Sequence, residues 1–430
     1  FNFLFIVVFT FSAYAQDLSW ENLNSENDKI VFKTDSEAIN KTLSNIKKNT
    51  ITNIKFPVDD FNFQEFLLEK DSQLKKDGKI NIQLYKGISK LKKDKIFVNV
   101  IGEIITITII QKNKRLHLSN VKNKNEFILS EIDTSNELEN ISSDFCKTDH
   151  DRSEHSQEKK SPLTNNLDPV GKTPDLIKYR MAISPTAEWS NYYIDLYDAQ
   201  DLGIDNKKAL VTSELNIAVS ELNSISGRDL SILFGLIPDN DKLIVFDTNL
   251  DGLTHGSKGS QINENITKLN NNVGFNSFDI GHVFDSSNYG GLAYVSSIGT
   301  PSKAGAATGG INGTGFYFVF AHEVGHQLGS WHTFNSDTNH GVEIGSGVTI
   351  MGYGPRGEEN LYYHAKSIKA ITAILKNRNI GTKVDGFSNT PPYYSTLPST
   401  LTYSVPAGTP LLLGDNFEMK DDEESELLFN

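Results

Sequence analysis

The sequence predicts an α/β (α+β) fold in which a mixed domain follows a β-rich N-terminal region. Segments rich in β-branched residues at Ile80–Tyr85, Ile96–Val100 and Ile104–Ile110 are typical of strands. Between residues 175 and 388, strand-like segments alternate with segments of helical periodicity. A histidine-rich segment with helical spacing, Thr314–His332, lies inside this second region.

Two segments are expected before the mixed domain. Residues 1–15 match a signal peptide, because the apolar run Phe1–Phe11 precedes Ala13-Tyr14-Ala15, a small-residue cleavage pattern. An N-terminal membrane anchor is the alternative. The chain does not begin with Met, so we expect it to be clipped at its start. Residues 16–145 are expected to form the β-rich domain.

Linkers are expected on both sides of the mixed domain. Residues 146–174 are charged and contain prolines, as in an exposed linker where proteolysis is favoured. The mixed domain follows at residues 175–388. Residues 389–400, rich in Pro, Ser, Thr and Tyr, are expected to be a second linker. Residues 401–430 are expected to begin a C-terminal β-sandwich domain that continues in the natural protein.

Charge and cysteine content exclude several classes of protein. The chain has 54 acidic and 41 basic residues and a net charge of −13, which argues against a general nucleic-acid binder. The single cysteine, Cys146, excludes a disulfide framework within the chain. After the first apolar run, no segment approaches the roughly 18 apolar residues of a membrane-spanning helix. No stable membrane insertion is therefore expected after signal cleavage.

The mixed domain is expected to contain a regular succession of strands and helices. The expected elements are a strand at Tyr179–Ser184, a helix at Lys207–Ser226 that Gly227 ends, a strand at Ser231–Ile237, a helix at Gln261–Asn271, strands at Phe278–Phe284 and Gly291–Ser296, the histidine-bearing helix, and a helix at His364–Lys376. Each helix has apolar residues at three- and four-residue steps, which predicts one buried face. We expect His282 to be a strand residue and His364 to pack against or cap the last helix.

One segment matches the start of a calcium-binding loop, Asp247–Gly252. The position at which such a loop requires an acidic ligand is Lys258 instead. We therefore expect a polar surface loop, because a Ca²⁺ site is not supported by a full motif. His150 and His155 are expected to be solvated residues of the linker.

The pattern H-E-x-x-H-x-x-G-x-x-H is formed by His322, Glu323, His326, Gly329 and His332. At about 100° per residue, the first two histidines lie within roughly 40° of each other on a helix. Gly329 can end the helix, because glycine tolerates the left-handed conformation of helix ends. The chain can then turn and bring His332 back toward the other two.

These residue types predict one catalytic Zn²⁺. Three neutral imidazoles leave one position of a tetrahedral ion open for water. Glu323 follows the first ligand and can act as the base for that water. The alternative is an amphipathic helix with two surface histidines, against which the added glycine and third histidine argue.

Downstream, Met351 lies in the glycine-containing turn Thr349–Gly354. With the histidine pattern, this turn resembles the signature of the metzincin zinc peptidases. The likeness covers residues 177–388 and is closest to the reprolysin-like (adamalysin, M12B-type) family. It implies a metzincin-type domain with a mixed five-stranded sheet, three main helices and an active-site cleft. It also implies that Met351 forms a hydrophobic floor under the zinc.

The resemblance suggests roles for four further residues. Tyr353 would approach the zinc or stabilise the oxyanion, as in some metzincins, or it simply packs in the turn. Gly291, Leu292 and Ala293 would form the edge strand to which an extended substrate adds by main-chain hydrogen bonds. The alternative is an edge strand without a ligand. Many family members have disulfides in this domain, and this chain cannot form one internally.

The implied function is that of a secreted bacterial zinc endopeptidase, extracellular or associated with the cell surface, that cleaves protein or peptide substrates. The β-rich domain resembles the pro-regions of such enzymes, which inhibit and assist folding; a binding module is the alternative. Cys146 would then supply a thiolate that keeps a zymogen latent, although Asp144–Lys147 does not match the familiar latency motifs. Cleavage beside Lys159 or Lys160 would activate the zymogen.

Other interpretations stay open. A catalytically silent, zinc-containing surface protein for binding or adhesion would keep the fold without turnover. A structural zinc site would use Cys146 as a fourth protein ligand. Cys146 can equally be a cysteine with no special role. The residues give no indication of the oligomeric state.

Overall fold

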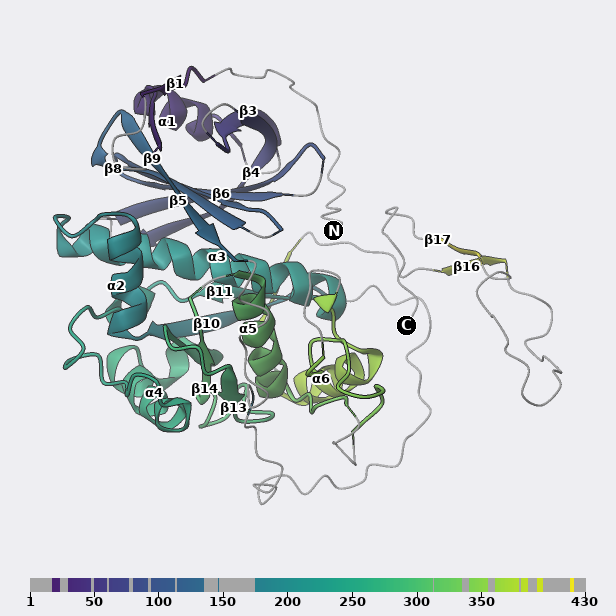
Figure 1. Cartoon of the computed structure of the whole chain (residues 1–430). Helices are drawn as coiled ribbons and strands as arrows, with labels where there is room; N and C mark the ends of the chain where they lie inside the picture. Colours follow the sequence, from purple (N-terminus) through teal and green to yellow (C-terminus); the bar gives the residue numbers. More distant parts are fainter. Residues whose placement is uncertain are drawn as a thin grey trace.

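A computed structural model describes most of the chain (Figure 1). The described residues are 18–23, 30–47, 50–59, 62–76, 80–91, 94–112, 114–134, 146, 175–311, 313–334, 340–354, 360–378, 380–385, 393–396 and 418–420. The expected signal peptide, residues 147–174 of the first linker and the C-terminal domain's expected first strand at Leu401–Leu413 lie outside them.

An antiparallel sheet of nine strands forms the N-terminal domain. Its strands are β1 (Glu21–Asn22), β2 (Ile30–Lys33), β3 (Thr52–Pro57), β4 (Phe63–Lys76), β5 (Ile80–Ser89), β6 (Lys95–Ile101), β7 (Ile104–Ile110), β8 (Lys114–Asn123) and β9 (Glu126–Asp133). They lie in the order β1-β2-β9-β8-β7-β6-β5-β4-β3, so consecutive strands from β3 to β9 are neighbours. The three strands predicted in this region are confirmed as β5, β6 and β7.

The two faces of this sheet have different partners, because successive side chains of a strand point to opposite sides. One face packs against α1 (Ser36–Ser44); Leu116 and Leu118 of β8 share an apolar cluster with Ile39 of this helix. The residues that alternate with them, Arg115 and His117, face the second domain and hydrogen-bond to it. The N-terminal sheet is therefore buried on both sides.

The second domain is built on the mixed sheet that the resemblance implied. Its strands are β10 (Ile177–Pro185), β11 (Ile232–Leu236), β12 (Ile280–Asp285), β13 (Gly291–Ala293) and β14 (Ala306–Gly309). The order is β11-β10-β12-β14-β13, with a short strand β15 (Thr382–Lys383) beside β10. β10, β11, β12 and β14 are parallel, and β13 alone among the five is antiparallel. β13 therefore lies at the edge, as expected, but ends at Ala293 rather than Ser296.

In the described part of the second domain, five α-helices surround the mixed sheet, where three main helices were expected. They are α2 (Ala187–Leu196), α3 (Ile204–Leu230), α4 (Lys258–Asn272), α5 (Gly313–Leu328) and α6 (Ala365–Arg378), with short 3₁₀ turns η2 (Asn240–Leu243) and η3 (Phe275–Ser277). The expectation that Gly227 ends α3 is wrong. The helix continues to Leu230 and ends at Ser231, which has φ 55°. A Cβ at Gly227 would lie 3.3 Å from the Leu233 side chain, so close packing of α3 on β11 explains this glycine.

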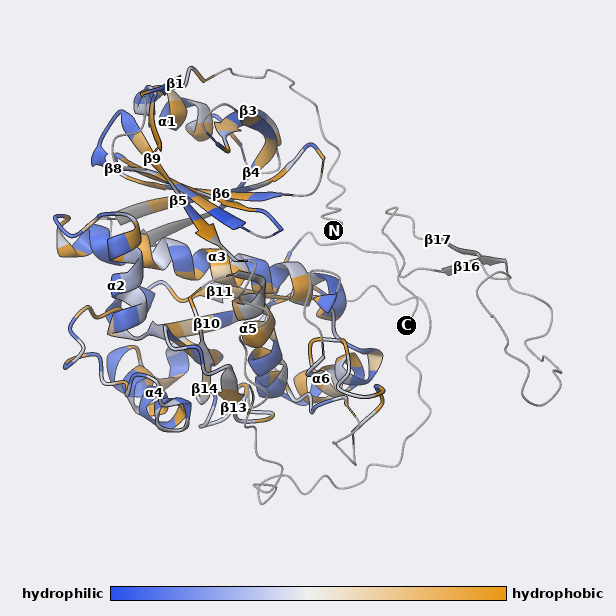
Figure 2. Ribbon diagram, in the orientation of Figure 1, coloured by the Kyte–Doolittle hydropathy of each residue, from blue (hydrophilic) through white to orange (hydrophobic). Residues whose placement is uncertain are grey.

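Helix α3 lies between the N-terminal sheet and the mixed sheet (Figure 1). Buried residues of both domains belong to one apolar cluster that includes Ile82 of β5, Leu215 of α3 and Phe284 of β12. Figure 2 shows hydrophilic residues over much of the outward surface of α4. None of the described helices combines the length and apolar character needed to cross a membrane.

Two strands are described after the second domain. β16 (Tyr393–Thr396) pairs antiparallel with β17 (Glu418–Lys420). β16 lies inside residues 389–400, which were expected to be a linker. Part of that segment is therefore a strand.

Candidate metal centre and active site

Three histidine side chains meet at the C-terminal end of α5. His322 and His326 belong to the helix, and His332 follows the turn at Gly329, whose φ of 113° is unfavourable for other residues. The Nε2 atoms of His322 and His326 are 3.1 Å apart. His332 Nε2 lies 3.3 Å from the former and 3.1 Å from the latter. The turn thus places three imidazole nitrogens around one point.

Backbone carbonyls fix which nitrogen of each helix histidine faces this point. His322 Nδ1 lies 2.6 Å from Ile350 O, and His326 Nδ1 lies 2.8 Å from Ser330 O. A carbonyl oxygen only accepts, so each Nδ1 carries the proton and donates it. The Nε2 lone pairs are then directed at the shared point, as metal-binding imidazoles require.

Cys146 is the fourth member of this buried cluster. Its Sγ lies 3.5 Å from His326 Nε2, and the ligand atoms of the four residues lie within 4.8 Å of one another. The backbones of Cys146 and Gly291 form an isolated parallel bridge. Tyr353 donates its hydroxyl proton to Cys146 O at 2.8 Å. Cys146 is therefore held by its main chain as well as its thiol.

The distances suit a tetrahedral zinc ion. Nitrogens at about 2.0–2.1 Å from zinc lie about 3.3–3.4 Å apart in a tetrahedron, close to the 3.1–3.3 Å between these histidines. A thiolate at about 2.3 Å from the ion would lie about 3.5–3.6 Å from each nitrogen, which agrees with the 3.5 Å from Cys146 to His326. The residues present therefore fit a Zn²⁺ ion.

The carboxyl group of Glu323 is fully buried beside the histidines. Burial raises its pKa to about 8, against smaller lowering contributions from the Cys146 thiol and the charge of Lys258. Among the described residues, neither carboxylate oxygen has a partner of ordinary hydrogen-bond geometry, so the thiol contact is a weak one. A carboxyl group with a raised pKa is suited to proton transfer near neutral pH.

Gly291 of the edge strand has no side chain, and the Glu323 side chain fills the space next to its Cα. A Cβ at this position would lie 2.3 Å from Glu323 Oε1 and 2.4 Å from its Cγ. Any larger residue must therefore displace the Glu323 side chain or the strand. The same glycine bridges to Cys146, so the edge strand contacts both the buried acid and the segment that supplies the thiol.

We expect the substitution Gly291→Ala to reduce kcat while zinc remains bound. The added methyl group moves the carboxylate, and a misplacement of about 1 Å can cost about 100-fold in rate. The measurement is kcat and KM beside the zinc content. Gly259→Ala in α4 is the matched control, because a Cβ there meets nothing within 4 Å. Unchanged kcat in Gly291→Ala would show that the close approach has no catalytic importance.

Met351 packs against the metal-binding helix, and Tyr353 contacts one of the three histidines. Met351 is fully buried, and a Cβ on Gly325 of α5 would lie only 2.6 Å from its Sδ. The methionine thus packs under the helix. The Tyr353 hydroxyl lies 3.2 Å from His332 Nε2, and its ring packs against those of His332 and Phe334. Tyr353 reaches the site and does not only pack in the turn.

Two residues that the sequence did not single out support the site. Gln327 is buried, and its Nε2 donates to Gly281 O (2.9 Å) and Lys303 O (3.1 Å), which joins α5 to the sheet. A polar residue on the apolar face of α5 was the available signal. Glu343 accepts hydrogen bonds from both Thr333 and Thr349. It therefore connects the segment after His332 to the methionine turn, and no spacing in the sequence predicts that contact.

We expect Glu343→Gln to destabilise the domain at neutral pH and to make its stability change less as the pH is lowered. Burial alone would raise the pKa of Glu343, but hydrogen bonds from Thr333, Thr349 and Val348 lower it below its ordinary value. A carboxyl group with a lowered pKa stabilises the fold at pH values above its pKa in the unfolded chain. This stabilisation is lost as the pH falls through its pKa in the folded protein. Thermal unfolding should show a Tm roughly 2–4 °C lower at pH 7. An equal difference at pH 7 and at pH 3 would contradict this explanation.

His282, His364 and Asp251 have structural roles. His282 is buried in β12, with its ring nitrogens near Gln327 Oε1 (3.1 Å) and Thr308 Oγ1 (2.8 Å), and burial lowers its pKa to about 3. His364 caps α6 by accepting from Lys366 N at 3.0 Å. In the loop at Asp247–Gly252, the Asp251 carboxylate accepts from Ala187 N (2.8 Å) at the start of α2. His150 and His155 lie outside the described residues.

Comparison with known proteins shows which family the second domain is similar to. Residues 212–333 match the model of the metallo-peptidase family M12B, reprolysin-like. No curated protein matches the chain. A solved chain from a structure described as a chaperone-substrate complex is similar at 12% identity and a TM-score of 0.30, over 63% of this chain and 39% of that one. A likeness of that degree supports no argument.

The matched residues include most of α3, all of α5 and the three histidines, and they end directly after His332. The match therefore includes the helix and the turn that carry the three histidines. The second domain is therefore similar to the reprolysin-like family of zinc metallopeptidases across its metal-binding helix, and its histidines fit a tetrahedral zinc ion.

Proposed function

We propose that this protein is a secreted zinc endopeptidase that cleaves protein or peptide substrates and is made as a latent zymogen. The observation that carries the proposal is the placement of three histidines and the thiol of a distant cysteine around one point, with the buried Glu323 next to the first histidine in the same helix. Four of these five groups come from α5 and its following turn, whereas Cys146 comes from before the second domain. The proposal therefore has a catalytic part and a regulatory part.

In the catalytic part, His322, His326 and His332 hold the metal. Zinc, when bound, supplies a Lewis acid that polarises the substrate carbonyl and acidifies water. Glu323 takes a proton from the attacking water and delivers it to the leaving amine. Its position supports this role, because the side chain is buried directly after the first histidine ligand and lies against the edge strand at Gly291. The hydroxyl of Tyr353 donates to the oxygen that becomes negative in the transition state.

The edge strand β13 positions the substrate. Gly291, Leu292 and Ala293 offer main-chain groups to an extended peptide, which adds to the sheet as a further strand. The bridge between Gly291 and Cys146 supports this role, since it is a main-chain contact from another segment to the same edge. In the latent form that segment takes the substrate's place.

In the regulatory part, the Cys146 thiolate would hold the ion together with the three histidines and would exclude water from it. Its distance to His326 Nε2 fits a shared ion. The N-terminal β-rich domain then acts as a pro-domain, and cleavage between Cys146 and Asp175, beside Lys159 or Lys160, belongs to activation. The signal peptide at residues 1–15 directs export, so the enzyme acts outside the cell or at its surface, with no nucleic-acid partner and no stable membrane insertion.

Cleavage of an unfolded protein tests the catalytic proposal. The chain is cut between Cys146 and Asp175, the fragment that contains α5 is purified and loaded with zinc, and casein is added as substrate. We expect hydrolysis that a zinc chelator abolishes and that added Zn²⁺ restores. A folded, zinc-loaded fragment without turnover would favour the silent binding or adhesion protein instead.

A further inference from the structure

We propose that α3 and α5 form a docking surface that retains the N-terminal domain as a separate polypeptide after the chain is cut. Cleavage in residues 147–174 would then leave Cys146 at the histidine cluster, and the enzyme would open only when the N-terminal fragment dissociates. The inhibitory consequence rests on the proposed peptidase function, whereas the docking itself does not.

The order of the chain makes retention relevant. Cys146 precedes the segment in which activation cleavage is proposed, and the second domain begins after that segment, at residue 175. A cut there leaves Cys146 covalently joined to the N-terminal domain, whose last strand β9 ends at Asp133. The cut therefore removes nothing from the metal centre. Only the contacts between the two domains decide whether the thiol stays.

Apolar residues form the main part of these contacts. Ile82 and Leu84 of β5 and Ile101 of β6 are buried and belong to the same apolar cluster as Leu215 and Leu222 of α3. An interface with the interior character of a domain core is typical of permanent complexes. Burial of these side chains supplies affinity that does not depend on the peptide bond between the fragments.

Buried polar groups fix the register of the two domains. Arg115 of β8 donates to Glu214 Oε2 of α3 at 2.7 Å, with side-chain exposures of 2% and 0%. The same guanidinium donates to Tyr317 of α5 at 3.0 Å. Tyr197, which caps the C-terminal end of α2, donates to Glu214 Oε1 at 2.6 Å, and His117 Nδ1 lies 3.1 Å from the same hydroxyl. Removal of either charge would leave its partner buried and unpaired at the closed interface, which is strongly unfavourable.

A second ion pair lies nearer the rim of the interface. Lys95 of β6 and Glu221 of α3 are 2.7 Å apart, with side-chain exposures of 13% and 7%. Glu214 and Glu221 are seven residues apart, so they lie on the same side of α3, two turns from each other. The sheet is therefore attached to α3 by ion pairs at two places rather than at one.

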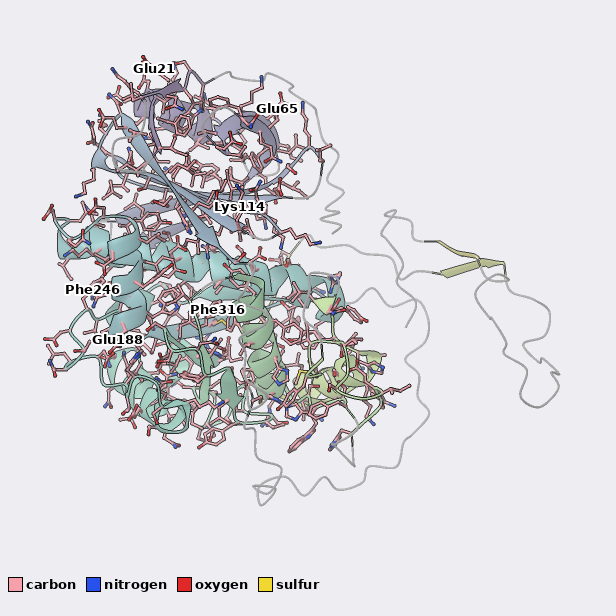
Figure 3. The ribbon with its side chains drawn as sticks, in the orientation of Figure 1. Glu21, Glu65, Lys114, Glu188, Phe246 and Phe316 are labelled. Carbon is pink, nitrogen blue, oxygen red and sulfur yellow. The ribbon has the colours of Figure 1, made fainter. Side chains whose placement is uncertain are left out.

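The docking surface is connected to the metal centre through α5. Tyr317 precedes His322 by five residues in this helix. Figure 3 labels Lys114, the neighbour of Arg115, on the sheet side of α3, and Phe316, the neighbour of Tyr317, on the opposite side. Docking and the Cys146 contact thus attach one fragment at two places, and such linked contacts can bind about 10²–10⁴ times more tightly than either alone.

The test uses the full chain with a recognition sequence for a specific protease inserted beside Lys160. After complete cutting, confirmed on a denaturing gel, size-exclusion chromatography with light scattering reports whether the fragments stay together. We expect one species with the mass of both fragments, and casein hydrolysis at least about tenfold below that of the separated α5-containing fragment. Fragments that separate on cutting, or a joined complex with full activity, would overturn the proposal.

Variants identify the surface that holds the fragments. Arg115→Ala should raise the dissociation constant of the cut complex about 100-fold or more. Lys114→Ala is the matched control on the same strand, because Lys114 pairs with the exposed Glu131 and should leave binding unchanged. If Arg115→Ala does not fold, the double variant Arg115→Met with Glu214→Leu removes both charges and should remain associated. If the fragments of cut Lys114→Ala separate while those of cut Arg115→Ala stay together, the assigned surface is contradicted.

A further variant separates this proposal from the peptidase function. Cys146→Ser should remain associated after cutting, because the docking surface is unchanged. Association without hydrolysis by any fragment would refute the peptidase function and leave docking supported. Hydrolysis by the uncut chain together with separation of the cut fragments would refute the docking proposal and leave the peptidase function supported.

Discussion

Glu323→Gln is expected to remove peptide-bond hydrolysis almost entirely while zinc stays bound. The side chain lies beside the three histidines but is not among the four groups that fit the ion. The amide is nearly isosteric with the carboxyl group and cannot take a proton from water. General acid–base catalysis contributes about 10²–10⁴-fold, so kcat should fall by that factor. The measurement is casein hydrolysis by the separated α5-containing fragment, beside its zinc content.

The shorter acid Glu323→Asp is the matched comparison. It keeps a carboxyl group but withdraws it from Gly291, which the Glu323 side chain contacts closely. We expect activity between those of the wild type and Glu323→Gln. Activity of Glu323→Gln within about tenfold of the wild type would exclude Glu323 as the base, since a base supplies at least about 100-fold.

The second large effect is expected in the uncut chain. Cys146→Ser should show casein hydrolysis at least about tenfold above that of the uncut wild type, because a hydroxyl is a much weaker zinc ligand than a thiolate. The increase should stay below that obtained on removal of the N-terminal fragment. The hydrogen bond from Tyr353 is accepted by the main-chain oxygen of residue 146, which a side-chain substitution leaves in place.

The separated α5-containing fragment is the control for this variant, because it lacks residue 146 and must be the same from either parent. Uncut Cys146→Ser that is as inactive as the uncut wild type, with zinc bound in both, would show that the thiol does not enforce latency. The main-chain bridge to Gly291 would then be the inhibitory contact.

The metal helix was predictable because its evidence is local. The spacing of His322 and His326 places both on one face, and Gly329 ends the helix so that His332 can return. The five strands that the family resemblance implies are present, and the short strand β15 adds a sixth beside β10. In contrast, the sequence pattern predicts that Gly227 ends its helix, but α3 continues past it, because close packing on Leu233 outweighs the weak helix propensity of glycine.

Contacts between distant residues could not be predicted from the same patterns. Arg115 and Glu214 are 99 residues apart and Cys146 and His326 are 180 residues apart, so no periodicity connects them. Glu343 likewise stabilises the site through hydrogen bonds that depend on how the chain folds after His332. Such contacts depend on tertiary packing, whereas helices and single motifs depend mainly on neighbours in sequence.

X-ray absorption at the zinc edge of the uncut protein tests the proposed metal centre directly. We expect a shell of three nitrogens at about 2.0–2.1 Å and one sulfur at about 2.3 Å, from the four residues that cluster here. The Cys146→Ser variant should lose the sulfur and keep the nitrogens. A wild-type shell without sulfur would contradict the placement of Cys146 at the metal, and a shell with fewer than three imidazoles would contradict the metal centre itself.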